Sequence, residues 1–390
     1  MRLSLCIAKY PNFLMSTVSF NCENQSLYIS AVFYVNSSYR QMTTELLCAT
    51  IKLNVLAHNI KSREVASLKA VVYRGSRNIK VEDVAIPKPS DNEILVKFKA
   101  GSICGTDLHF YRGEWTWIKP GTIIGHDACG VRVDTDERVA IGPIIYCSSC
   151  YFCLRGLQTL CENGKVLGFG VNGLFAEFVV LPPRNLIPIP ENVSDEEAAI
   201  LEPVALAIRT LDSLQPKLMD WVTIIGQGPI GLLMTQVAKL KGCQVIAIDM
   251  QDYRLKLSKR YDADICMNAA EDNVVKRVKE ITKRGSDIVI EAAGKKQAVK
   301  LTPFLVRKAG RVALIGESKG YLNLEKADET SFSTYYISPT EYPMALNLIS
   351  KKVVDVKGLI THRFRLDDFE LAIKTADSPT EKPVKVVITT

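Results

Sequence analysis

The residues with the clearest chemical potential lie between positions 104 and 161. The second half of this stretch contains four cysteines at short spacings, namely Cys147, Cys150, Cys153 and Cys161. Four thiolates separated by such short loops can surround one metal ion tetrahedrally, and four sulfur ligands leave no open position for a substrate. We therefore expect a structural zinc site here, with an iron–sulfur cluster as the main alternative. Disulfides are less favoured, since no secretory signal is found in the sequence.

Cys104 and His126 lie just before this cluster. A catalytic zinc ion needs three protein ligands and one open position for water or substrate. A thiolate and an imidazole supply two of these ligands, and a carboxylate would complete the set. Glu202 is a candidate, because it stands before Pro203 in otherwise apolar sequence, where an unpaired buried carboxylate is costly. A salt bridge is the simpler interpretation of Glu202, and a metal ligand or a residue that holds one is the functional interpretation.

A glycine motif farther along the chain indicates a dinucleotide site. Residues 221–225 form an apolar stretch typical of a strand, and Gly226-Gln-Gly228-Pro-Ile-Gly231 follows at once. Gly226 permits the tight turn, and Gly228 lets the backbone approach a pyrophosphate at the helix N-terminus. Gly231 lets the following helix pack closely on the strand.

The segment after this motif indicates which dinucleotide, NAD or NADP, the site prefers. A helix is predicted over 229–241 and a strand over 244–249, which ends in Asp249. The order of strand, glycine turn, helix, strand and acid turns a weak motif into a specific one. Asp249 is placed to accept hydrogen bonds from an adenosine ribose, and its charge would repel a 2′-phosphate, so NAD is favoured over NADP.

Two kinds of element must position these motifs. Alternating segments at 68–73, 79–84 and 93–98 predict antiparallel strands, with further strands at 173–181 and 384–388. Apolar segments at 263–267, 287–291 and 311–315, with helical sequence between them, predict parallel strands. A helix is predicted over 195–211, with Ser194 as its N-cap and Glu197 completing a capping box.

Composition excludes several classes of protein. The chain has 390 residues, enough for two domains, with 47% hydrophobic and 23% charged residues. The net charge of +7 is modest, and no basic run suggests nucleic-acid binding. Apolar runs are too short to span a bilayer, so a cytoplasmic protein without membrane partners is expected. Residues 1–67 lack the periodicity of the rest.

From Leu68 onward the chain resembles the zinc-dependent medium-chain dehydrogenases, which include alcohol, sorbitol and threonine dehydrogenases. The matching signatures are Cys104-Gly-Thr-Asp-Leu-His109, Gly125-His126, the four-cysteine cluster, Leu201-Glu202-Pro203 and the glycine motif. The resemblance implies an α/β protein with a GroES-like β-rich catalytic domain, residues 68–213 with 342–390. A Rossmann domain with a doubly wound parallel sheet, residues 214–341, would interrupt it and bind NAD. Relatives of this kind suggest a homodimer or homotetramer.

The resemblance also implies roles for single residues. Cys104 and His126 would bind catalytic zinc, Glu202 would be a third ligand or hold the zinc-bound water, and Thr106 would relay the substrate proton. The cofactor-binding residues would be Gly226, Gly228, Pro229, Ile230, Gly231, Asp249 and Arg254. The implied reaction is hydride transfer between NAD and a secondary alcohol such as a polyol or sugar. The alternatives are L-threonine 3-dehydrogenase activity and an inactive zinc-binding scaffold.

Three features depart from the family pattern. Asp127 follows the motif histidine, where the family usually has glutamate, and it is a further candidate zinc ligand with a shorter reach. The connection from His126 to Cys147 is short, which suggests a trimmed hairpin. Leu68-Lys-Ala-Val stands where relatives commonly begin with methionine. One hypothesis is that Leu68 is the true initiator and residues 1–67 are upstream sequence. The alternative is a genuine, poorly ordered extension.

Overall fold

The computed structural model describes residues 67–116, 118–316, 322, 328–336 and 339–390. The predictions for residues 1–67 therefore fall on a segment that lies outside the described residues, apart from Ser67 itself. Residues 65–390 belong to one compact unit, which contains the two larger sheets described below.

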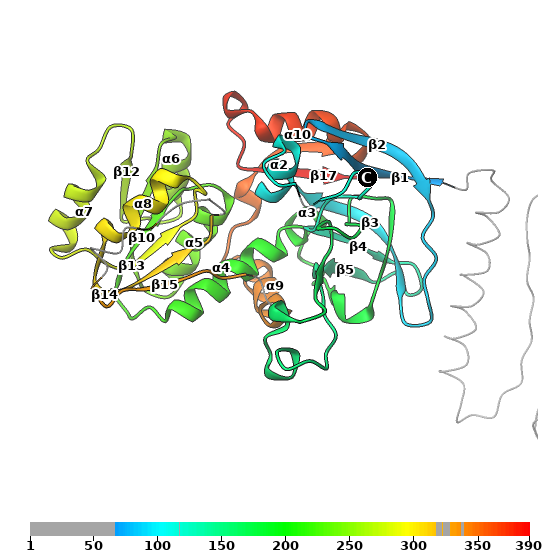
Figure 1. Cartoon of the computed structure of the whole chain (residues 1–390), viewed down its shortest axis with the longest axis horizontal. Helices are drawn as coiled ribbons and strands as arrows, with labels where there is room; N and C mark the ends of the chain where they lie inside the picture. Colours follow the sequence, from blue (N-terminus) through cyan, green and yellow to red (C-terminus); the bar gives the residue numbers. More distant parts are fainter. Residues whose placement is uncertain (1–66, 117, 317–321, 323–327, 337–338) are drawn as a thin grey trace, which may run out of the picture. The chain divides into compact units, whose positions relative to one another are not determined.

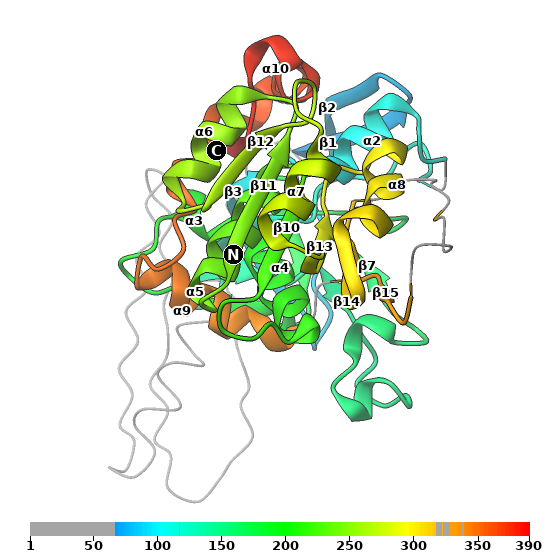
Figure 2. The same cartoon turned by 90° about the vertical axis from the view of Figure 1, so that its left-hand side faces the viewer.

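The first large sheet is parallel and has six strands in the order β12-β11-β10-β13-β14-β15. Their bounds are Ile265–Asn268, Gln244–Asp249, Trp221–Ile225, Ser286–Glu291, Val306–Leu314 and Ser331–Ser333, respectively. The strands are apolar because helices cover both faces. Helices α5 (Pro229–Leu240) and α6 (Asp252–Arg260) lie on one side, and α7 (Val274–Thr282) and α8 (Lys296–Leu305) lie on the other (Figure 2). The sheet is thus doubly wound, as the sequence predicts.

The strand order reverses between β10 and β13. In open sheets of this kind, ligands bind in the crevice outside the carboxyl ends of the strands at such a switch point. The glycine motif directly follows β10, and Glu291 ends β13. Both therefore lie where a dinucleotide would be expected.

The second large sheet has seven strands and is mostly antiparallel. Its strands are β16 (Ile360–Arg365), β17 (Lys385–Thr389), β3 (Ile94–Ser102), β4 (Ala128–Arg132), β5 (Arg138–Ile141), β9 (Leu186–Pro188) and β8 (Phe178–Leu181). The C-terminal strand β17 pairs with β3, for example Val387 with Ser102, so the end of the chain returns beside its early strands (Figure 1). A hairpin of β1 (Ser67–Gly75) and β2 (Asn78–Ala85) accompanies this sheet.

The helix predicted over 195–211 is wrong as one helix, because it is divided into α3 (Asp195–Ala198) and α4 (Leu201–Leu214). Pro203 has no N–H to donate to the Ala199 carbonyl four residues earlier. The Ser102 hydroxyl donates to that carbonyl instead, at 3.0 Å. The helix therefore ends and restarts, and the capping box of Ser194 and Glu197 is confirmed at its beginning.

The structure also bears on the strand expected over 173–181 and on the short connection after His126. The strand expected over 173–181 is shorter, since β8 begins only at Phe178. Its first part bonds to a loop instead, with the Leu174 N–H donating to the Gly125 carbonyl at 2.9 Å. The connection after His126 is short, since β4 and β5 pair directly and only residues 133–137 join them; that a hairpin is trimmed relative to the family stays a prediction.

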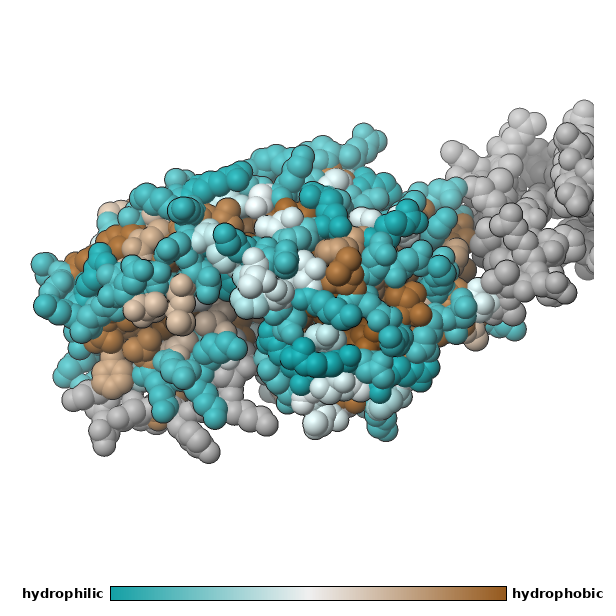
Figure 3. All heavy atoms as spheres, turned by 90° about the horizontal axis from the view of Figure 1, so that it is seen from above, coloured by the Kyte–Doolittle hydropathy of each residue, from teal (hydrophilic) through white to brown (hydrophobic). Residues whose placement is uncertain are grey.

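Helix α4 links the two sheets. One hydrophobic core cluster contains Val204 of α4 together with Ile224 of the parallel sheet and Val387 of the mixed sheet. The face drawn in Figure 3 is largely hydrophilic, with apolar side chains in patches between the polar ones. None of the helices in the described ranges combines the length and hydropathy that a membrane span requires.

Candidate metal and dinucleotide site

Cys104 is held at the start of helix α2 (Gly105–Arg112), where it is the N-cap residue. Its backbone N–H donates to Oδ2 of Asp107 at 2.9 Å, so Asp107 orients this loop. The Thr106 hydroxyl lies 3.8 Å from the Cys104 sulfur, within the same turn.

His126 and Asp127 come from the loop that leads into β4, and they meet Cys104. The sulfur of Cys104, a ring nitrogen of His126 and a carboxylate oxygen of Asp127 all lie within 4.8 Å of one another. His126 and Asp127 are 3% and 1% exposed. Nδ1 of His126 and Oδ1 of Asp127 have no hydrogen-bond partner in the described part of the chain. Unpartnered buried ligand atoms of N, O and S type suit a zinc ion.

The charges of Cys104, His126 and Asp127 also indicate a site for a zinc ion. Burial lowers the pKa of His126, but the nearby Asp127 carboxylate and Cys104 thiolate outweigh burial and raise it well above its usual value. A proton on the imidazole would thus offset the negative charge when no cation is bound. A zinc ion bound by the same groups would take over that role.

Lys385 is a buried cation that the sequence analysis missed. Its ammonium group donates to Oδ2 of Asp127 at 3.0 Å and to the Ile103 carbonyl at 3.2 Å. Lys385 is only 2% exposed. Burial lowers its pKa, but Asp127 and Cys104 raise the pKa above the usual value, so Lys385 stays charged. Oδ2 of Asp127 therefore accepts hydrogen bonds from Lys385 and from the Ser102 hydroxyl, the second at 3.2 Å. Oδ1 of Asp127 faces His126, with 3.8 Å to Nε2.

Glu202 lies in the first turn of α4, in the same electrostatic neighbourhood but outside the 4.8 Å group. The pKa of Glu202 is raised to about 8, chiefly by burial and also by the charge of Asp127, while His126 and Lys385 oppose the rise. The interacting charges show that Glu202 shares the environment of Cys104 and His126. Its role as zinc ligand stays a prediction.

The four-cysteine cluster is compact. The sulfurs of Cys147, Cys150, Cys153 and Cys161 lie within 4.8 Å of one another. Backbone N–H groups, chiefly that of Ser149, lower the pKa of Cys147 to about 5, whereas burial raises that of Cys153 to about 12. Four thiols at this distance cannot all ionise without a cation, because each thiolate repels the others. A bound zinc ion would remove that conflict, and these residues fit one.

His109 has a packing environment. Its Nδ1 pairs with the Glu114 carboxylate, and its ring stacks on Trp115 with centroids 4.6 Å apart. These contacts account for His109 without a role in proton transfer.

The glycine motif is shaped by close backbone contacts. Gly226 has φ of +91°, a conformation that favours glycine. A Cβ on Gly231 would lie 1.8 Å from the Gly226 carbonyl oxygen, whereas a Cβ on Gly228 would approach nothing closer than Arg254 at 4.0 Å. Packing therefore requires glycine at position 231, whereas a side chain at position 228 would meet no close protein atom.

A cavity of about 630 Å³ lies beside this turn. Of the predicted cofactor residues, Gly226, Gly228, Asp249 and Arg254 line it, whereas Pro229, Ile230 and Gly231 do not. Other walls come from residues outside the predicted set, among them Ala292, Ala293 and Lys295. The cavity has the size and the glycine-lined wall that a dinucleotide requires.

Asp249 is fixed inside this cavity. Its Oδ2 accepts from the Gln227 N–H at 2.6 Å, and its Oδ1 accepts from the Gln251 N–H at 2.9 Å. Arg254 lies 3.8 Å from Asp249. The carboxylate thus links the glycine turn to the end of β11, where a ribose would lie.

We expect Gly231→Ala and Gly228→Ala to differ. Gly231→Ala should lower the melting temperature and weaken NADH binding by at least about 10-fold, because the methyl group displaces the Gly226 carbonyl. Gly228→Ala should leave the melting temperature unchanged and weaken NADH binding only through contact with the cofactor. Fluorescence titration with NADH and thermal unfolding would measure both. Equal NADH affinity in Gly228→Ala and the unmodified protein would contradict the assignment of this turn.

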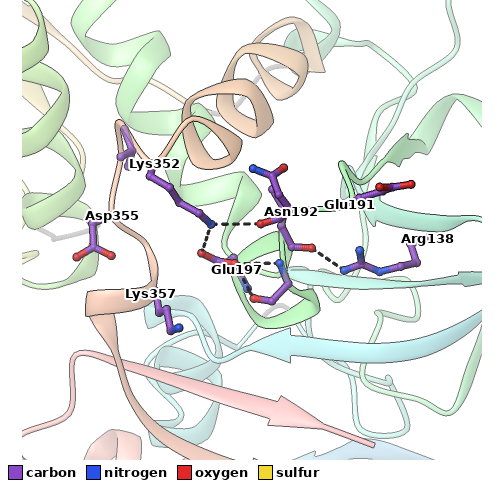
Figure 4. A pocket seen from close by; sticks show the side chains of 10 residues that line it. Arg138, Glu191, Asn192, Glu197, Lys352, Asp355 and Lys357 are labelled. Atoms are coloured by element: carbon purple, nitrogen blue, oxygen red, sulfur yellow. Dashed lines mark hydrogen bonds and ion pairs between the residues drawn. The ribbon is translucent and has the colours of Figure 1, made fainter.

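A second cavity, of about 570 Å³, is highly charged (Figure 4). Lys352 donates to Glu197 at 2.8 Å, and Arg138 donates to the Val193 carbonyl at 2.7 Å. The network joins the start of α3 to the segment after α9 (Tyr342–Ser350). Of the described residues that line this cavity, none is a predicted metal or cofactor residue. Because charged side chains in this cavity are paired with neighbouring groups, we interpret the network as a contact that stabilises the fold.

Two family models match the chain. The model described as alcohol dehydrogenase GroES-like domain covers residues 90–191, and the model described as zinc-binding dehydrogenase covers residues 229–351. The two matched regions contain the four-cysteine cluster and part of the glycine motif, respectively.

Curated relatives match most of the chain. L-Threonine 3-dehydrogenase of Pyrococcus furiosus is 33% identical over 338 residues, which cover 81% of this chain and 96% of that protein. Sorbitol dehydrogenase of Bacillus subtilis is 29% identical over 343 residues, which cover 83% of this chain and 97% of that protein.

A solved structure shows the same architecture. Alcohol dehydrogenase rspB of Escherichia coli CFT073, complexed with NADH, superposes with a TM-score of 0.77 at 29% identity. The match covers 83% of this chain and all of the other. Together with the family models and relatives, it confirms a GroES-like and a Rossmann-type part. The chain therefore belongs to the zinc-dependent medium-chain alcohol dehydrogenase family, oxidoreductases that act on CH–OH groups with zinc and a nicotinamide cofactor.

Proposed function

We propose that the protein oxidises a secondary alcohol of the polyol or sugar type, reversibly, with NAD. The observation that carries this proposal is the buried group of Cys104, His126 and Asp127, whose ligand atoms lie within 4.8 Å of one another and remain partly unpartnered. Cys104 and His126 would be zinc ligands, and Glu202 or Asp127 would be the third. Support for Asp127 is its free Oδ1, and support for Glu202 is its raised pKa beside the cluster.

The chain's own residues would orient the substrate and move its proton. A zinc ion held by Cys104, His126 and a carboxylate would supply Lewis-acid activation of the hydroxyl group, and bound NAD would supply the hydride acceptor. Thr106, 3.8 Å from the Cys104 sulfur, would take the hydroxyl proton and pass it towards solvent. Lys385 would hold the carboxylate of Asp127 in place, and the burial of this group would exclude water from the charged atoms.

The remaining assignments complete the proposal. Residues 68–213 with 342–390 would form the catalytic domain and residues 214–341 the NAD-binding domain. The backbone around Pro229, Ile230 and Gly231 would receive the pyrophosphate at the N-terminus of α5, and Asp249 with Arg254 would bind the ribose. Cys147, Cys150, Cys153 and Cys161 would hold a structural zinc ion. A homodimer or homotetramer in the cytoplasm is the corresponding cellular form.

L-Threonine 3-dehydrogenase activity is the second candidate. It is favoured by the identity of 33% to the enzyme of that name from Pyrococcus furiosus. Threonine is a secondary alcohol as well, so the same zinc and hydride chemistry would apply. The two candidates differ only in the polar groups that surround the reacting carbon.

The test is NAD-linked turnover of the zinc-loaded full chain against a substrate panel. Sorbitol, xylitol, galactitol phosphate, L-threonine and simple secondary alcohols would be compared, each with NAD and with NADP. We expect zinc-dependent NADH formation with the polyols and at least about 10-fold lower kcat/KM with NADP, because Asp249 repels the 2′-phosphate. Turnover restricted to L-threonine would replace the polyol assignment. No turnover with any alcohol, in a protein with both zinc sites filled, would overturn the proposal.

A further inference from the structure

Glu291 is a buried acid at the edge of the dinucleotide cavity that no assignment above uses. It is the last residue of β13, which lies next to β10 at the switch point of the parallel sheet. Its side chain is fully buried. Its backbone carbonyl accepts from the N–H groups of Ile315 and Gly316, at 2.8 and 3.0 Å. The backbone of Glu291 is thus held between β10 on one side and the end of β14 on the other.

The carboxylate of Glu291 turns back onto the segment that follows it. Oε1 accepts from the N–H of Ala293 at 3.0 Å and from the N–H of Gly294 at 2.9 Å. Residues 292–295 precede α8, whose N-cap residue Lys295 makes no side-chain cap bond. Glu291 therefore supplies the bonds that fix this turn, which we call the 292–295 turn.

The position of Glu291 has an energetic cost. Oε2 is buried and has no hydrogen-bond partner among the described residues. Burial raises the pKa of Glu291 to about 7, although the N–H groups of Ala293 and Gly294 lower it. A buried, half-satisfied carboxyl group is unfavourable for folding, and such groups are found where function requires them.

The 292–295 turn connects Glu291 to the cofactor cavity. Ala292, Ala293 and Lys295 line that cavity together with Gly226 and Gly228. The contact with the glycine turn is direct, because a Cβ on Gly226 would lie 2.6 Å from the Ala293 nitrogen. The Ala292 N–H also donates to the Ile225 carbonyl at 2.8 Å. A shift of the 292–295 turn would therefore move one wall of the cavity and press on the glycine turn opposite.

We propose that Glu291 is a positioning residue for the dinucleotide: its buried carboxyl group holds the 292–295 turn against Gly226 and so sets the affinity for NAD. The inference rests on the proposed NAD-dependent function. Glu291 acts through the turn and touches neither the candidate zinc ligands nor the four-cysteine cluster. Its replacement should therefore alter cofactor binding and leave zinc content unchanged.

The test compares NADH binding in two variants of the zinc-loaded full chain by fluorescence titration. Glu291→Ala should raise the Kd for NADH roughly 10- to 30-fold, because two hydrogen bonds that order the turn are lost. Glu291→Gln should stay within about 3-fold of the unmodified protein, because its amide oxygen can still accept from Ala293 and Gly294. In turnover, KM for NAD should rise in Glu291→Ala with little change in kcat, which a purely structural role would not produce.

Glu197→Ala is the matched control. Glu197 is also a buried acid that accepts a backbone N–H, that of Ser194 at 2.9 Å, but it lies in the charged network of Figure 4, away from the residues of the cofactor cavity. The Glu197→Ala variant should have a lower melting temperature than the unmodified protein and the same Kd for NADH. If Glu291→Ala does not fold, Glu291→Met replaces it, since methionine fills a similar space but has no oxygen to accept from the two N–H groups.

The outcomes separate the inference from the proposed function. Absence of NADH binding by the unmodified protein would overturn the cofactor assignment and the inference with it. Binding by the unmodified protein with an unchanged Kd in Glu291→Ala, or in its replacement Glu291→Met, would overturn the inference alone. An equal rise in Kd in Glu197→Ala would also overturn it, because the effect would then follow from general destabilisation.

Discussion

Replacement of Cys104 by alanine should reduce turnover by roughly 10³-fold or more, the largest effect on activity that we expect of any single substitution. Loss of the thiolate leaves His126 and one carboxylate, too few ligands for zinc, and activation of the hydroxyl by the metal contributes several kcal/mol. Zinc content should fall from two ions to one per chain, because the four-cysteine cluster is separate. NADH binding should persist. Metal analysis and steady-state kinetics measure these quantities.

Cys266→Ala is the control for Cys104→Ala. Cys266 lies in β12, is partly buried and belongs to neither group of candidate ligands. Its replacement should keep both zinc ions and the turnover. If Cys104→Ala retained turnover, zinc catalysis at this position would be excluded. If it lost both zinc ions, the two sites would not be independent.

Replacement of Lys385 by methionine should lower the free energy of unfolding of the zinc-free protein by about 3–5 kcal/mol. The pair of Lys385 and Asp127 is almost fully buried, with 3.0 Å between Nζ and Oδ2. Removal of the cation leaves the Asp127 carboxylate buried, with the Ser102 hydroxyl bonded to Oδ2 and Nε2 of His126 3.8 Å from Oδ1. Urea unfolding in the presence of a chelator would measure the loss, because a bound zinc ion would partly replace the missing charge.

Two further variants make this prediction specific. The double variant Lys385→Met with Asp127→Asn should recover much of the stability, because no unpaired charge remains. Arg363→Met breaks an exposed pair with Glu196, at 2.8 Å, and should cost less than about 1 kcal/mol. A loss in Lys385→Met no larger than that in Arg363→Met would show that the buried pair does not stabilise the fold.

Much of the site could be predicted because its motifs are local. The four cysteines lie within 15 residues, and the glycine motif lies within six residues, directly after β10. Short loops leave such residues little freedom to diverge, and the bonds that shape them are formed within the same segment. The capping box of Ser194 and Glu197 was predictable for the same reason.

Elements were predicted well where the apolar pattern alone decides them. Strands β10 and β11 have the predicted bounds, because both faces are buried and every residue is selected for packing. The break between α3 and α4 was not predicted although Pro203, which cannot donate to the Ala199 carbonyl, stands in the sequence. The partner that this carbonyl finds instead, the Ser102 hydroxyl, lies 97 residues away. Helical periodicity contains no signal of that contact.

The sequence by itself determined the family, the two kinds of sheet and the residue types of the candidate metal sites, because these depend on residue identity and short spacing. Only the tertiary structure decided which charged groups meet. Lys385 reaches Asp127 across 258 positions because β17 pairs with β3, and the 292–295 turn held by Glu291 reaches Gly226 because β13 lies beside β10. Such contacts arise from strand pairing between distant segments, and the residue types alone do not specify the partner.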